Sequence, residues 1–246
     1  LTLGYKDTYF LEGTGRVDQS SNLPSSNNTY FYPSVSGSIV LSNLLKQDWL
    51  SYTKLRGNWA QVGKATGNYG INDTYSIVGL YGNTPIVNPR TFKNNPDLKP
   101  EISTEVELGI EAKFLNNRLG FDISAYKTNS KDQIMRVDVS SASGYAQKWI
   151  NAGEIENKGI ELQLNVIPVK TKNLTWDVTF NWATNENKVI NLAPGINNLL
   201  LGTAVGSVTY NAQEGESYGT IKGTDYIYAP DGQRVIDAST GRYKIT

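Results

Sequence analysis

Three glutamates are the residues of this sequence that most resemble a pair of catalytic acid–base groups. Glu105, Glu107 and Glu111 alternate with apolar residues, so in a strand they share one face. Carboxylates two positions apart on a strand lie about 6.8 Å apart, a distance that overlaps the range of inverting glycosidases. An acidic wall that pairs with neighbouring basic groups explains the same three residues equally well. We therefore expect no catalytic residue here. A polysaccharide hydrolase is the function that this sequence supports least.

The composition lowers the expectation of enzymatic chemistry further. The chain has no histidine, which removes the commonest general base, metal ligand and pH switch. It has no cysteine, which excludes disulfides and cysteine-ligated metals. Its 23 basic and 23 acidic residues cancel, so no global field attracts nucleic acid. We expect no cofactor, no metal and no nucleic-acid partner.

Two further motifs are better explained by local structure than by ligand binding. Gly13-Thr14-Gly15 is not followed by a helical pattern, which argues against a dinucleotide loop. Asp225, Asp231 and Asp237 surround Pro230-Asp231-Gly232 and could suggest a calcium loop. Because Asp-Gly is first of all a turn signal, we favour a turn.

Alternation of apolar and polar residues dominates the elements that would position any site. Apolar residues occupy every second position from Ile160 to Val166, which predicts a strand with one apolar and one polar face. The same pattern recurs along the chain. The expected strands are about 1–5, 9–18, 30–40, 51–62, 102–115, 118–129, 155–168 and 173–186. No helix is expected, and no apolar run reaches the roughly 18–20 residues of a spanning helix, a test that does not detect transmembrane strands.

The connections between these strands alternate in length. Lys6-Asp7 and Asn116-Asn117 are short polar turns, and Asn tolerates positive φ. Long polar connections of about 19–29, 63–101, 130–154 and 187–216 separate the strand pairs. Strands of roughly 10–14 residues with short turns at one end are typical of outer-membrane barrels, whereas sandwich strands are shorter. The expected fold is all-β, an antiparallel transmembrane β-barrel with short periplasmic turns and long extracellular loops.

The two faces of the strands suit such a wall. The polar faces are too charged for a dry core and suit a lumen, and the apolar faces would contact lipid. Five aromatic residues near strand ends are candidates for interfacial girdles: Tyr9, Tyr30, Tyr52, Trp176 and Trp182. The alternative is a secreted carbohydrate-binding β-sandwich, which would bury the apolar faces of two sheets against each other.

Six short motifs follow one another along the chain. They are Arg16-Val-Asp18-Gln-Ser20-Ser21; Tyr32-Pro33-Ser34-Val35-Ser36; Trp49-Leu50 with Lys54-Leu55-Arg56 and Gln61-Val62-Gly63; Asn95-Pro96-Asp97-Leu98-Lys99-Pro100-Glu101; Asn151-x-Gly153 with Asn157-x-Gly159-x-Glu161; and Asn181 with Asn185-x-Asn187-Lys188-Val189. In type and order they resemble motifs of the SusC/RagA-type TonB-dependent transporters of Bacteroidetes. Gln19 replaces a usual Gly, and Pro100 replaces a usual Trp. The resemblance covers about residues 5–190 well and the tail only loosely.

The resemblance implies that residues 1–246 are an internal segment of a 22-stranded barrel, without the plug domain and the terminal strands. Both ends of the chain also look like strand. It implies a location in the outer membrane of a Gram-negative bacterium, in contact with lipid, and TonB-dependent import of oligosaccharides or oligopeptides rather than enzymatic activity. A SusD-like surface lipoprotein would cap the loops, and TonB would act through the absent N-terminal region. A dimer of transporter–lipoprotein pairs is implied as well.

The long loops are the expected functional surface. The 63–101 loop carries Tyr69, Tyr75 and Tyr81, and the 130–154 loop carries Tyr145 and Trp149. Aromatic faces bind sugar rings and peptide side chains, although the same residues could pack the loops on one another. Tyr145 and Trp149 are the predicted substrate-binding residues.

Overall fold

The structure is a computed structural model that describes residues 1–67 and 70–246. Tyr69, one of the predicted loop tyrosines, lies outside the described residues. The chain divides into two compact units, residues 1–187 and residues 188–246. Among the described residues, no helix is long and apolar enough to cross a membrane.

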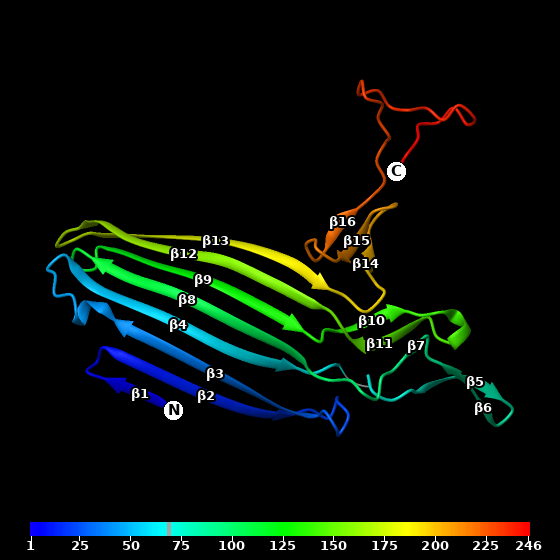
Figure 1. Cartoon of the computed structure of the whole chain (residues 1–246), viewed down its shortest axis with the longest axis horizontal. Coiled ribbons are helices and arrows are strands. Elements are labelled where there is room, and N and C mark those ends of the chain that lie inside the picture. Colours follow the sequence, from blue (N-terminus) through cyan, green and yellow to red (C-terminus); the bar gives the residue numbers. More distant parts are fainter. Residues whose placement is uncertain (68–69) are drawn as a thin grey trace. The chain divides into compact units, whose positions relative to one another are not determined.

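The first unit is built on one eight-stranded antiparallel sheet (Figure 1). Each strand pairs with the next one of the sheet along the chain, so the sheet is a meander. In spatial order the strands are β1 (Thr2–Tyr5), β2 (Tyr9–Gln19), β3 (Thr29–Val40), β4 (Leu50–Lys64), β8 (Glu101–Phe114), β9 (Leu119–Lys131), β12 (Glu154–Lys170) and β13 (Thr175–Asn191). The predicted strands are confirmed, with ends that differ by a few residues.

The register places the apolar residues of neighbouring strands in continuous rows. Leu55 pairs with Ile110, Ile110 with Ile123, and Ile123 with Leu162. Leu108 in the adjacent row is 66 % exposed and Trp176 on β13 is 57 % exposed, so no second protein layer covers this face within the described part of the unit. A sandwich would bury these side chains, and the sandwich alternative is therefore wrong.

The opposite face carries charged and amide side chains at the same depth. Arg56 pairs with Gly109, Gly109 with Ser124, and Ser124 with Glu161. Tyr52 also belongs to this face, because it lines a surface hollow with Lys54 and Arg56. Tyr30 packs beside Tyr32, whose hydroxyl donates to Asp18. Placing Tyr30 and Tyr52 in a lipid-facing girdle was therefore wrong, because alternation along β3 and β4 turns both toward the polar side.

The turn between β8 and β9 is wider than the predicted pair Asn116-Asn117. Phe114 pairs with Leu119, which leaves residues 115–118 outside the ladder. Leu115, Asn116 and Asn117 all have positive φ, at 52°, 57° and 63°. The Arg118 N–H donates to the Phe114 carbonyl at 3.1 Å and closes this four-residue turn.

The long connections contain strands of their own, which the sequence did not predict. In the first unit these are β5 (Tyr75–Tyr81), β6 (Thr84–Pro89), β7 (Phe92–Lys93), β10 (Ile134–Asp138) and β11 (Gln147–Asn151), with the short 3-10 turns η1 (Leu41–Asn43) and η2 (Ser141–Ser143). β5 and β6 form a hairpin, and β10, β11 and β7 form a three-stranded sheet in that order.

The second unit has a small sheet of β14 (Asn198–Thr203), β15 (Thr209–Gln213) and β16 (Thr220–Lys222). Its core consists of Val189, Leu192 and Ala212, with Ile196 and Leu199 packed against them. Isolated bridges such as Tyr226–Ile245 and Ile236–Tyr243 organise the last residues.

Candidate functional site

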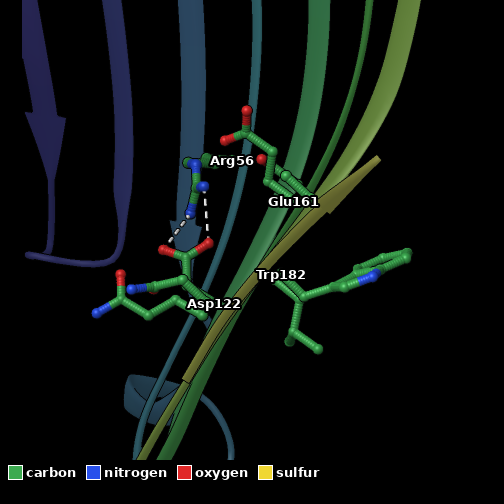
Figure 2. A pocket seen from close by; sticks show the side chains of 9 residues that line it. Arg56, Asp122, Glu161 and Trp182 are labelled. Atoms are coloured by element: carbon green, nitrogen blue, oxygen red, sulfur yellow. Dashed lines mark hydrogen bonds and ion pairs between the residues drawn. The ribbon is translucent and has the colours of Figure 1, made fainter. Parts of the chain in front are cut away.

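The polar face of the large sheet centres on a fork between Arg56 and Asp122. The Arg56 Nη1 atom lies 3.0 Å from Asp122 Oδ2, and Nη2 lies 2.8 Å from Oδ1 (Figure 2). Arg56 Nε is also 3.5 Å from Glu107 Oε1. One guanidinium on β4 therefore ties together carboxylates of β8 and β9, in the two-point geometry that makes Arg–carboxylate pairs strong.

A shallow hollow of about 510 Å³ opens beside this fork. Its lining includes Arg56, Asp122, Ser124, Glu161 and Asn181. The Trp182 side chain points away from Arg56 and Asp122, as the alternation of β13 requires (Figure 2). The lining combines charged and hydrogen-bonding groups with apolar side chains such as Leu162, and the hollow is wide open, so it does not enclose a small molecule.

The three glutamates singled out from the sequence share the polar face, and each has a protein partner. Glu105 accepts from Thr128 Oγ1 at 2.9 Å, Glu107 contacts Arg56 and Asn58, and Glu111 lies 2.8 Å from Lys113 Nζ. These contacts support the interpretation as an acidic wall that pairs with neighbouring groups.

Of the three aspartates near the end of the chain, Asp231 and Asp237 cap their own turns, and Asp225 accepts the Tyr226 N–H at 2.7 Å. Asp231 accepts the Gln233 N–H at 3.0 Å, and Gly232 has a φ of 85°, which confirms the predicted turn. Asp237 accepts from the Ser239 hydroxyl at 2.6 Å and from its N–H at 2.9 Å, and these bonds lower the pKa of Asp237. Within residues 1–67 and 70–246 there is no cluster of three or more acidic side chains that could hold a metal ion.

Tyr145 lies half-buried in the long connections and joins three segments. Its hydroxyl is 3.4 Å from Asp73 Oδ2, and Lys93 Nζ lies 5.6 Å from its ring centroid. Burial, followed by the nearby Asp73 carboxylate, raises the pKa of Tyr145. These contacts fix the connection around Asp73 to the one that carries β11.

Trp149 lies on β11 among partners that the sequence analysis did not identify. Its ring meets Phe92 edge-on at 6.5 Å, and the Arg136 guanidinium lies 5.3 Å from its centroid. Arg90 and Arg136 lie 5.4 and 5.5 Å from the Phe92 ring centroid. Phe92 reaches this cluster through the two-residue parallel pairing of β7 with β11, which has too short a sequence pattern to be recognised.

The meander has an uncovered apolar face and a charged opposite face. It also has short turns at one end and folded loops at the other. Together these features define a section of a transmembrane β-barrel wall. The comparison with protein-family models agrees with this class. The model described as TonB dependent receptor-like, beta-barrel, matches residues 1–246, and the chain belongs to that family. Proteins of this family are outer-membrane barrels of receptors, so the long loops are extracellular and the short turns periplasmic.

Several TonB-dependent receptors have similar sequences. TonB-dependent receptor P26 of Formosa agariphila is 29 % identical over 97 % of this chain and 25 % of its own length. TonB-dependent receptor SusC of Bacteroides thetaiotaomicron is 31 % identical over 76 % of this chain and 20 % of its own length. The chain spans a quarter or less of the length of each of these curated relatives.

Solved structures share the fold. The RagAB peptide importer in its closed-closed state aligns with 100 % of this chain and 28 % of that chain, with a TM-score of 0.81 and 23 % identity. The siderophore receptor PirA of Pseudomonas aeruginosa aligns with 85 % of this chain and 37 % of that chain, with a TM-score of 0.50 and 17 % identity.

Proposed function

We propose that the protein to which this chain belongs imports oligosaccharides or oligopeptides across the outer membrane, energised by TonB. The chain contributes part of the barrel wall and of the extracellular loops, and Tyr145 and Trp149 contact the cargo. The single observation that carries the proposal is the uncovered apolar face of the eight-stranded sheet, backed by a charged face. Such a sheet is stable in water only if another layer covers it, whereas hydrocarbon covers it in a bilayer.

Further parts of the proposal rest on the family and on the fraction of the relatives that the chain spans. Residues 1–246 would be an internal segment of a 22-stranded barrel, with the plug domain and the terminal strands elsewhere in the parent protein. A SusD-like surface lipoprotein would cap the loops, and two such pairs would form a dimer. Purification of the tagged parent protein in mild detergent tests these partners, because a lipoprotein should copurify in equal amount.

Uptake by whole cells tests the transport proposal. Deleting the parent gene should abolish uptake of one class of fluorescent cargo, and restoring the gene should restore uptake. Deleting the gene for TonB should have the same effect without lowering the amount of the protein in the membrane. If deletion of the parent gene leaves uptake of every oligosaccharide and oligopeptide pool unchanged, the proposed function is wrong.

A further inference from the structure

In the extracellular loops, β10, β11 and β7 form a three-stranded sheet (Figure 1). Arginine and aromatic side chains gather on one of its faces. Arg136 on β10 is paired with Trp149 on β11, so their side chains share a face. Phe92 on β7 is paired with Gln147, two residues before Trp149, and therefore lies on the same face. We call Arg90, Phe92, Arg136 and Trp149 the arginine–aromatic face.

Two guanidinium groups are held on this face by rings rather than by carboxylates. Arg90 and Arg136 both lie within 5.5 Å of the Phe92 centroid, and Arg136 is 5.3 Å from the Trp149 centroid as well. A ring attracts a guanidinium without accepting its N–H groups as a carboxylate does, so these donors stay available to a ligand. The rings thus position these donors without using them.

Neither guanidinium has a carboxylate within ion-pair distance in the described part of the chain. Arg56, by contrast, is engaged by both Asp122 and Glu107. The acidic residue of the same face, Asp138, accepts a hydrogen bond from Gln147 Nε2 at 3.0 Å. The face therefore carries two uncompensated positive charges beside one occupied carboxylate.

We propose that the arginine–aromatic face binds an oxyanion of the cargo, a carboxylate or sulfate group on an acidic oligosaccharide. The inference rests on the proposed function and narrows its substrate class. Guanidinium groups bind carboxylates and sulfates through paired N–H donors, and an arginine already held beside aromatic rings loses less side-chain entropy on binding.

The neighbouring groups favour a sugar over a peptide as the bearer of the oxyanion. Trp149 supplies the kind of aromatic surface on which a pyranose ring packs. Gln147 Nε2 donates one N–H to Asp138, which leaves its second N–H and the other acceptor positions of the carboxylate for the hydroxyl groups of a sugar. An acidic peptide also offers carboxylates, but its aspartate and glutamate side chains carry no hydroxyl groups for Gln147 and Asp138.

Binding by the purified full-length protein in detergent tests the proposal. The probes are tetragalacturonate, a sulfated galactose tetramer, neutral maltotetraose and tetraglutamate, each titrated by calorimetry. We expect the acidic sugars to bind and maltotetraose to bind at least about tenfold more weakly, since a charge-assisted hydrogen bond contributes about a factor of ten. Arg90→Gln with Arg136→Gln should weaken acidic-sugar binding by at least about tenfold, and 0.5 M NaCl should weaken it in the unmodified protein.

Lys148→Gln is the matched control. Lys148 lies on the same strand as Trp149 but on the opposite face, so the change removes one positive charge, half of that removed in the double variant, from the same small sheet. It should leave acidic-sugar binding within about twofold. Resistance of each variant to denaturation by detergent without heating verifies that the barrel has formed.

Four results would overturn the inference. They are equal binding of neutral and acidic sugars, no binding of either acidic sugar, unchanged binding in the double arginine variant, and binding of tetraglutamate alone. None of them contradicts import by the parent protein, which the uptake experiment tests separately.

Discussion

Gly109 is the residue that allows Arg56 to reach its two carboxylates. A Cβ atom at position 109 would lie 2.7 Å from both the Cζ and Nε atoms of Arg56. We expect Gly109→Ala to displace the guanidinium, break the fork with Asp122 and lower the free energy of unfolding by about 1 kcal/mol, the scale of a partly exposed ion pair. Denaturant unfolding in lipid vesicles measures the change. Gly79→Ala, where no atom lies within 4 Å of the added Cβ, is the control and should not destabilise the protein.

For individual residues, the sequence predicted which residue types form the site but not which side chains they contact. Alternation was enough to assign Glu105, Glu107 and Glu111 to one face. Trp149 was selected for its aromatic ring, yet its contacts with Phe92 and Arg136 depend on strand pairing inside the loops. Such pairing joins positions far apart in sequence, and no local pattern specifies it.

Among the elements, the turn between β8 and β9 contains a strained residue. Leu115 has a φ of 52° and is 57 % exposed, so it adopts a left-handed conformation without compensating burial. We expect Leu115→Asn to raise the free energy of unfolding by about 1 kcal/mol, because Asn tolerates this conformation. Leu44→Asn is the matched control, since Leu44 is similarly exposed at 52 % but has a φ of −95°. A gain of the same size in Leu44→Asn would contradict the explanation.

The exposed apolar face of the strands leads to a prediction about the effect of a charge on the lipid-facing side. Leu108 lies in the middle of β8, points to the apolar face and is 66 % exposed. Leu108→Arg should destabilise the barrel in vesicles by roughly 2–4 kcal/mol, the cost of an arginine near the bilayer midplane. The same change at Leu45, in the connection between β3 and β4, should cost less than about 1 kcal/mol. Equal effects at both positions would argue against a lipid-exposed Leu108.

The eight wall strands were predictable because hydrocarbon and water act on opposite faces and impose a strict period of two. The wider turn at residues 115–118 was missed because it needs positive φ at a leucine, which residue preferences do not suggest. The loop strands were missed because β5, β6, β7, β10 and β11 are short and lie among polar residues. Tyr52 was assigned to the wrong face because the prediction considered its position near a strand end and not which face the alternation of β4 gives it.

For the whole molecule, the two ends of the wall should be on different sides of the membrane. An epitope inserted at Gly82, at the tip of the β5–β6 hairpin, should bind antibody on intact cells. An epitope at Lys172, between β12 and β13, should bind only after the outer membrane is permeabilised. Labelling of both sites on intact cells would contradict the assigned orientation.

The pairing of Lys64 with Glu101 has a consequence for how such proteins diversify. These residues close the β4–β8 ladder, and Lys64 Nζ lies 3.3 Å from Glu101 Oε2. The connection that contains β5, β6 and β7 therefore begins and ends at neighbouring positions of the barrel wall. Mutation can lengthen, shorten or exchange that connection without displacing a strand of the barrel wall, so the extracellular surface can change in evolution while the wall is retained.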